Sequence, residues 1–168
     1  MRTAILFAVL ATPTFADVSL TFIESAPKDR FVVTNAGCPL VDATLIIDLA
    51  TAPAGVIFDV TAQGAGVEVF QPVELVAGTA TLSSITDGDQ RLTISLGTME
   101  TDAEVIISAD LDDLQANGAL GQIRVAGSEI AGTSAILSTA TGTYTATFTD
   151  QAVVRVGVPA STDDCPSS

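Results

Sequence analysis

The sequence predicts an all-β protein in which antiparallel strands form a two-layered sandwich. Strand-like segments recur roughly every 8 to 12 residues, and short clusters containing Gly, Asn or Asp separate them. Thr, Val and Ile, which favour strands, are abundant. An amphipathic helix is hard to place, since the best candidate, residues 110–119, has a single apolar pair before Asn117 and Gly118 end it.

The predicted strands follow one another along the chain and account for most of it. The first alternates polar and apolar residues over 17–24, as a half-buried strand does, and it ends before a turn at 27–29. The second, 30–34, stops at residues 35–37, where Asn and Gly tolerate a positive φ. Residues 86–89 form the clearest hairpin turn. The remaining predicted strands span 43–49, 56–60, 67–70, 73–76, 79–85, 91–96, 103–109, 122–125, 133–138 and 142–158.

The N-terminal region is expected to be an export signal. Arg2 supplies a positive start, residues 4–11 form an apolar run, and Ala16 ends a segment of the kind that signal peptidase cleaves. The alternative, a membrane anchor, needs about 20 apolar residues, and Pro13 interrupts this run too early. The mature protein would then reside in the periplasm, at the cell surface or outside the cell. The predicted organisation is a signal peptide over 1–16, a β-sandwich domain over 17–160 and a polar tail over 161–168.

The chain contains two cysteines, Cys38 and Cys165. Disulfides persist in oxidising compartments, so export favours a bridge between these two residues. Such a bridge would tie the tail to the domain and close a long loop, which chain-entropy models associate with about 5 kcal/mol of stabilisation. The alternative is a bridge between two chains through an exposed Cys165.

Composition and charge exclude several classes of function. There are 20 acidic and 6 basic residues, for a formal net charge of −14, whereas nucleic-acid binders need Lys and Arg to neutralise phosphates. Because the chain has no His, His-based catalytic triads, zinc sites and blue-copper sites are impossible. We therefore expect no enzymatic activity, and an enzyme acting through two convergent carboxylates is the least favoured hypothesis.

Acidic residues are concentrated between Asp87 and Asp113, where Arg91 is the one basic residue. Calcium takes about six to eight oxygen ligands, commonly loop carboxylates and backbone carbonyls, so Ca²⁺ is the one cofactor that this pattern indicates. The alternative is a solvated acidic surface, because neither acidic loop has the glycine and closing Glu of an EF-hand. The candidate ligands are Asp87, Asp89, Asp110, Asp112 and Asp113.

Three stretches carry a resemblance to a known group of proteins. Residues 22–37, residues 55–61 together with 66–72, and residues 127–133 resemble small exported bacterial proteins labelled aggregation factor core proteins. That label derives from sponge cell-adhesion proteoglycans, so the resemblance implies extracellular, calcium-dependent association and brings no catalytic residues. The turn at 34–37 also resembles immunoglobulin-like modules of bacterial surface proteins. Both resemblances imply a single antiparallel β-sandwich, of immunoglobulin-like or jelly-roll type.

Two functional hypotheses follow from the sequence. The first is an exported structural or adhesive module, which associates with a protein, a surface glycan or a second copy of itself through its strand edges, with calcium as a candidate requirement. The alternative is a periplasmic protein that binds a small ligand or ion, which requires a concave pocket with convergent polar groups. A flat, well-packed sandwich would favour association, whereas a lined cavity would favour ligand binding.

Overall fold

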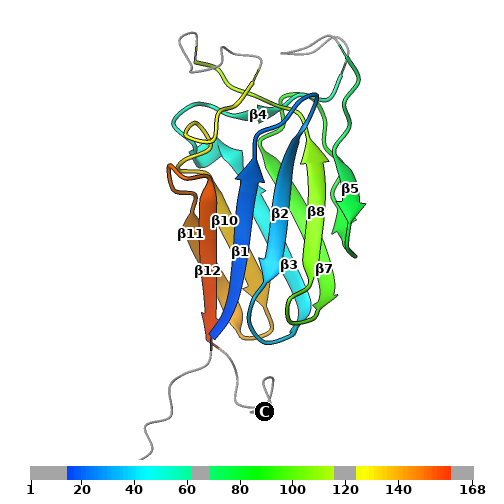
Figure 1. Cartoon of the computed structure of the whole chain (residues 1–168), viewed down its shortest axis with the longest axis vertical. Coiled ribbons are helices and arrows are strands. Elements are labelled where there is room, and N and C mark those ends of the chain that lie inside the picture. The colour runs from blue at the N-terminus through cyan, green and yellow to red at the C-terminus, as the bar shows by residue number, and fades with distance from the viewer. Residues whose placement is uncertain (1–14, 62–68, 116–123, 160–168) are drawn as a thin grey trace, which may run out of the picture.

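The protein is an antiparallel β-sandwich of two five-stranded sheets (Figure 1). The computed structural model describes residues 15–61, 69–115 and 124–159. Every strand pair within these ranges is antiparallel. The predicted fold class, an all-β sandwich, is therefore confirmed.

One sheet, here the β1 sheet, has the strand order β12-β1-β2-β8-β5. Strand β1 pairs with β2 on one side and with β12 on the other, so Leu20 lies opposite both Val33 and Val154. Phe15 and Ala16, the last residues of the predicted signal, also pair with β12. The strands are β1 (Phe15–Ile23), β2 (Asp29–Asn35), β5 (Glu74–Ala77), β8 (Glu104–Ala109) and β12 (Val153–Pro159).

The second sheet, the β3 sheet, has the order β11-β10-β3-β7-β6 and packs against the first. Its strands are β3 (Leu40–Asp48), β6 (Thr81–Leu82), β7 (Arg91–Met99), β10 (Ser134–Thr139) and β11 (Gly142–Thr147). A short pair forms near one end of the sandwich, from β4 (Ile57–Phe58) and β9 (Leu111–Asp112), with the 3₁₀ turn η1 at Leu49–Thr51.

The core lies between the two sheets and is built by the alternation that the sequence displays. Phe31 and Ile107 point inward from the β1 sheet, and Leu45 and Ile94 point inward from the β3 sheet, each with 0% of its surface exposed. Aromatic rings add directional contacts, since the centroids of Phe31 and Phe148 are 6.3 Å apart. Burying the apolar face of each strand is the main force that holds the two layers together.

Several predicted strands are shorter than the sequence indicates. The predicted strand 56–60 is a strand only at β4, and 79–85 only at β6. In the segments 67–70 and 122–125, the described residues belong to no strand, and the other residues lie outside the described ranges. Val56 and Val125 have no exposed surface, although neither lies in a strand. These two β-branched residues are therefore buried in loops and are not paired in a sheet.

The helix candidate at 110–119 is also not a helix where the structure describes it, because β9 begins at Leu111. This stretch forms a short strand instead, in which Leu111 pairs with Phe58 and Asp112 pairs with Ile57. Over the described ranges, no helix has the length and the apolar character that crossing a membrane requires.

Asn35 ends β2 through hydrogen bonds and not through a positive φ. Its buried side-chain Nδ2 donates to the carbonyl oxygens of Cys38, Met99 and Glu100 at 2.8, 3.0 and 3.2 Å. Its Oδ1 accepts a hydrogen bond from the Gly37 amide at 3.1 Å. Neither Asn35 nor Gly37 has a positive φ, so the strand end was predicted correctly but for the wrong physical reason.

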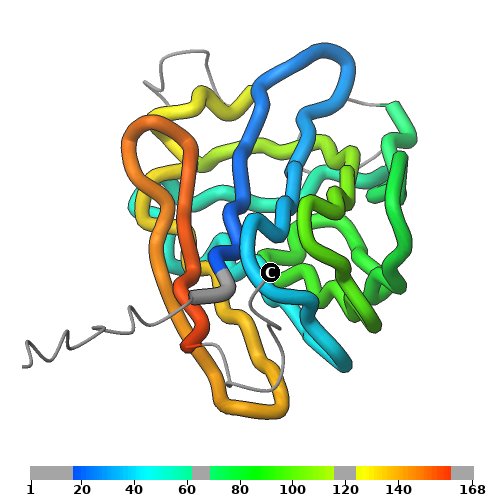
Figure 2. Tube along the Cα trace, turned by 60° about the horizontal axis from the view of Figure 1, so that its bottom comes forward, coloured from blue at the N-terminus to red at the C-terminus, as the bar shows by residue number. Residues whose placement is uncertain are grey.

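The two ends of the sandwich carry different loops. Figure 2 shows the β1–β2 loop (blue) at the end opposite the β10–β11 turn. The β2–β3 loop, with Cys38, lies at the same end as the last residue of β12 (Figure 1). Cys38 is buried and is not a free thiol. Cys165 lies outside the described residues, so its bridge to Cys38 stays a prediction, which the shared position of Cys38 and the β12 end favours.

Candidate functional site

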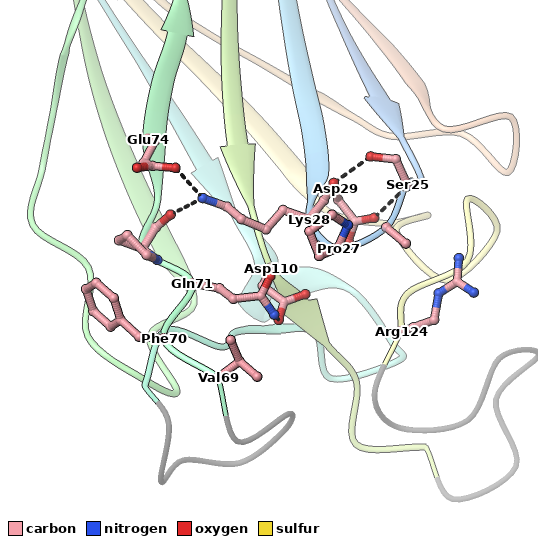
Figure 3. Close-up of a pocket in the computed structure, with 12 residues that line it drawn as sticks. Ser25, Pro27, Lys28, Asp29, Val69, Phe70, Gln71, Glu74, Asp110 and Arg124 are labelled. Atoms are coloured by element: carbon pink, nitrogen blue, oxygen red, sulfur yellow. Dashed lines mark hydrogen bonds and ion pairs between the residues drawn. The ribbon is translucent and has the colours of Figure 1, made fainter.

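A cavity of about 660 Å³ opens at the end of the sandwich where the β1–β2 loop, the segment before β5 and the end of β8 meet (Figure 3). We call it the loop-end pocket. It joins segments that are far apart in the sequence and that the β1 sheet brings together, since Asp29 lies opposite Ala109 and Glu74 lies opposite Ser108. Its lining residues are Ser25, Ala26, Pro27, Lys28, Asp29, Val69, Phe70, Gln71, Pro72, Glu74, Asp110 and Arg124.

The β1–β2 loop is shaped by local hydrogen bonds. The backbone amide of Ser25 donates to Oδ1 of Asp29 at 3.0 Å, and the Ser25 hydroxyl donates to the carbonyl oxygen of Lys28. Side chains of Asp and Ser commonly replace backbone partners in this way at turns. Asp29 is the first residue of β2 and is 5% exposed, so its carboxylate is held in place at the pocket wall.

Lys28 connects this loop to the segment that leads into β5. Its Nζ donates to Oε2 of Glu74 at 2.7 Å and to the carbonyl oxygen of Pro72. The Lys28 side chain is 13% exposed and that of Glu74 is 61% exposed. Since the ammonium already has an anionic and a neutral partner, it acts chiefly as a tie between two walls of the pocket.

Gln71 and Asp110 form the base of the pocket. The Gln71 Nε2 donates to Oδ2 of Asp110 at 2.6 Å, and both residues are buried. The backbone of Gln71 donates to the Val60 carbonyl at 3.1 Å, and the Asp59 amide donates to the Asp110 carbonyl at 3.0 Å. These bonds fix the position of the Asp110 carboxylate relative to the β4 segment.

The two buried carboxylates of the pocket influence one another. Burial, helped by the negative charges of Asp110 and Glu24, raises the pKa of Asp29 to about 7, against the hydrogen bond from Ser25 and the charge of Arg124. Burial also raises the pKa of Asp110, against the nearby charge of Lys28 and the hydrogen bond from Gln71. Both carboxyl groups therefore keep a proton to a higher pH than an exposed Asp does.

The walls of the pocket are largely apolar. Phe70 is 66% exposed and Val69 is 54% exposed, which is unusual for side chains of this type. Pro27 and Pro72 add further apolar surface. Arg124 lies at the rim, where its Nη2 pairs with Oε1 of Glu24 at 3.0 Å. A few polar groups inside an apolar wall are typical of small-ligand sites.

The five predicted calcium ligands separate into two groups in the structure. Asp87 and Asp89 lie in the loop between β6 and β7, where both accept hydrogen bonds from the backbone. Asp87 Oδ1 accepts from the Val60 amide at 3.1 Å. Asp89 Oδ2 accepts from the Thr86 amide at 2.7 Å and from the Thr86 hydroxyl at 2.9 Å. Both acids thus have structural partners that explain their positions.

Asp110, Asp112 and Asp113 lie at and beside β9, next to Asp59, which directly follows β4. Asp112 is 1% exposed, and within the described part of the chain neither of its carboxyl oxygens has a hydrogen-bond partner. Burial, followed by the charges of Asp59, Asp110, Asp113 and Asp87, raises the pKa of Asp112 to about 7. Burial likewise raises the pKa of Asp113, whose Oδ1 accepts from the Gln115 amide at 2.6 Å.

These acids come near one another without forming a recognisable cation cage. No three His, Cys, Asp or Glu side chains of the described residues are arranged so that they could hold a metal ion. Calcium binding by the predicted set therefore stays a prediction. The structure adds Asp59 to this neighbourhood, a residue that sequence reasoning placed in a strand and not in an acidic site.

Sequence reasoning missed most of the loop-end pocket. Of its lining residues, only Asp110 was a candidate, and in the role of a calcium ligand. The sequence did indicate a turn at residues 27–29, which does form the pocket rim. No sequence pattern relates Gln71 to Asp110, since their contact depends on how the segment before β5 crosses the end of β8.

Comparison of the chain with family models, with curated proteins and with solved structures gave no match. The resemblance to aggregation factor core proteins accordingly stays a prediction from the sequence.

Proposed function

We propose that the protein is an exported binding domain that takes a small ligand into the loop-end pocket. The observation that carries this proposal is the cavity of about 660 Å³ with apolar walls and convergent polar groups. Small-ligand sites typically measure about 300–1,000 Å³ and have this mixture of surfaces. Of the two hypotheses that the sequence left open, a lined cavity supports ligand binding.

The pocket is also held in shape without a ligand. Lys28 ties the β1–β2 loop to Glu74, and Gln71 ties the segment before β5 to Asp110. A site whose walls are already fixed loses less conformational entropy on binding. The exposed ring of Phe70 would gain free energy by covering an apolar ligand, at about 25 cal/mol per Å² buried. Both features favour binding at this position.

We propose binding without chemical conversion. The chain has no His, and Asp29 and Asp110 each have a structural hydrogen-bond partner in Ser25 and Gln71. A hydroxyl or thiol nucleophile is normally activated by an adjacent base, most often His. The two acids are better suited to recognising a ligand by charge and hydrogen bonding.

The experiment that tests this proposal is a fragment screen followed by two-dimensional NMR. We expect some fragments to shift the amide signals of Ser25, Asp29, Gln71 and Asp110 together, because these residues line one cavity. Fragments that shift no pocket signal, over a library of neutral, cationic and anionic compounds, would contradict the proposal.

A matched pair of variants sharpens the screen. Phe70→Ala removes an exposed ring of the pocket wall and should weaken the affinity of the hits about three- to tenfold. Val41→Ala removes an apolar side chain that is 56% exposed and lies outside the pocket, so it should leave the affinity unchanged. Equal losses in both variants would show that the fragments bind exposed apolar surface in general.

A second candidate function, association through a strand edge, is favoured by β5. This strand is at the edge of the β1 sheet, and all four of its residues are exposed, with Leu75 at 37% and Val76 at 58%. Unpaired backbone groups on such an edge can accept a strand from another chain. We propose this surface as the place where an adhesive function would act.

Light scattering over a concentration series, with and without Ca²⁺, tests this second candidate. Association through β5 predicts a mass that rises with protein concentration and that Val76→Lys holds at the monomer value, because a Lys on an edge strand opposes pairing. Calcium-dependent adhesion predicts that the rise needs Ca²⁺. A monomer in every condition would rule out self-association.

A further inference from the structure

We propose that the loop-end pocket binds an organic cation, specifically a protonated primary amine attached to a short apolar chain. This inference rests on the proposed function, because it names the class of ligand that the pocket would accept.

The positive charges of the pocket are already paired. Lys28 donates to the carboxylate of Glu74 at 2.7 Å and to a backbone carbonyl. Arg124 donates to the carboxylate of Glu24 at 3.0 Å. An anionic ligand would compete with these carboxylates for the two cations, and it would lie beside carboxylates that repel it.

The negative charges of the pocket keep capacity for a further partner. Asp29 accepts a hydrogen bond on Oδ1 from Ser25, and Asp110 accepts hydrogen bonds from Gln71, on Oδ2, and from the backbone of Leu111. A carboxylate has about four acceptor positions, so each group can accept more hydrogen bonds from a ligand. An ammonium group offers three donors and a compact positive charge, which suits a site between two carboxylates.

The apolar walls favour a ligand with a hydrocarbon part. The ring of Phe70, together with Pro27 and Pro72, lines the same cavity as the two acids. An aromatic ring attracts a nearby cation through its negative face, and all three side chains lose water when an alkyl chain covers them. The ligand chemistry is therefore an ammonium that extends from a short alkyl chain, either in a free amine or in the side chain of a lysine.

The test compares three probes of equal chain length by NMR titration of the unaltered protein: n-pentylamine, 1-pentanol and pentanoate. We expect pentylamine to bind at least about tenfold more tightly than pentanol, and pentanoate to bind more weakly than either. Pentanol or pentanoate binding as tightly as pentylamine would overturn the inference. N-acetyl-lysine methylamide distinguishes the sources, since similar affinity to pentylamine supports a lysine side chain and much weaker affinity supports a free amine.

Variants of the two acids test the assignment. Asp110→Asn and Asp29→Asn should each weaken pentylamine binding at least about tenfold and leave pentanol binding unchanged. Asp150→Asn removes the same charge from an exposed turn outside the pocket and should have no effect. If one variant does not fold, as judged from its NMR spectrum, the other variant and the three-probe comparison still decide the inference.

The outcomes separate this inference from the proposed function. Neutral fragments that bind the pocket while amines gain no advantage would overturn the choice of ligand and leave the pocket's role in place. A pocket that no fragment of any charge enters would overturn both.

Discussion

Gln71 donates a hydrogen bond of 2.6 Å from its Nε2 to Oδ2 of Asp110, across 39 residues of sequence. Both side chains are buried, so the bond replaces water that each group would otherwise contact. It links the segment before β5 to the end of β8, and it determines which oxygen of Asp110 remains available to a ligand. The shape of the loop-end pocket depends on this contact.

Replacing Gln71 with Ala should destabilise the protein by about 1–3 kcal/mol, because it removes the side-chain donor of a buried carboxylate. Urea denaturation would measure the change. Gln151→Ala is the matched control, since Gln151 is exposed and its recorded hydrogen bond is made by its backbone. Equal stability of the two variants would show that the Gln71–Asp110 contact does not hold the pocket together.

Binding of pentylamine should strengthen as the pH rises from 5.5 to 8.5. Burial raises the pKa of Asp29 to about 7, so this carboxyl is mostly protonated at the lower pH and ionised at the higher one, while the amine keeps its charge. The charged groups that act on Asp29 are Asp110, Glu24 and Arg124. NMR titrations at the two pH values would measure the effect, and Asp29→Asn should remove most of it. An affinity that does not change with pH would argue against ionised Asp29 as a partner of the ammonium.

Asp112→Asn should stabilise the protein at pH 8. The folded state holds the pKa of Asp112 at about 7, above its value of about 4 in the unfolded chain. The folded state therefore binds more protons between these values, and stability falls as the pH rises from about 4 to 7. Asn cannot ionise, so the gain should be absent at pH 4 and reach about 1–3 kcal/mol at pH 8. Denaturation curves at both pH values, with Asp150→Asn as control, would measure it, and a loss of stability at pH 8 would contradict the account.

The calcium hypothesis makes a separate prediction for the same region. Millimolar Ca²⁺ should raise the Tm, because a ligand that binds only the folded state stabilises it, and Mg²⁺ should not. Asp112→Asn should abolish the rise if the acids beside β9 hold the ion. A thermal unfolding curve that Ca²⁺ leaves unchanged would reject calcium binding by these residues.

The predicted Cys38–Cys165 bridge can be tested by chemistry alone. The mature protein should show no free thiol under denaturing, non-reducing conditions, and it should run as a monomer on a non-reducing gel. Reduction should then lower the stability by about 2–5 kcal/mol. A free thiol, or a disulfide-linked dimer, would contradict the internal bridge.

The fold could be predicted because its signal is local. The alternation of polar and apolar residues in β1 and β2, and the turn around Gly88, are visible within a few neighbouring residues. Strands were wrongly predicted around Val56 and Val125, which are buried in loops. A buried β-branched residue gives the same sequence pattern in a loop as in a strand.

The site could not be predicted because it depends on contacts between distant segments. Asp29, Gln71 and Asp110 come from three parts of the chain, and they meet because β2, β8 and β5 pair side by side in the β1 sheet. The acidic residues around Asp110 were visible in the sequence. The sequence did not show that the Asp110 carboxylate accepts a hydrogen bond from the Gln71 amide, or that the pocket around it has apolar walls. A sequence shows where acidic residues occur along the chain, and the fold determines which of their carboxylates are buried.

The most direct test of the account is an experimental structure of the protein with n-pentylamine, or an NMR map of the complex. The account predicts the ammonium within hydrogen-bonding distance of the carboxylates of Asp29 and Asp110, with the alkyl chain against Phe70. An amine that binds at the β5 edge, or that leaves the signals of both carboxylates unchanged, would contradict it.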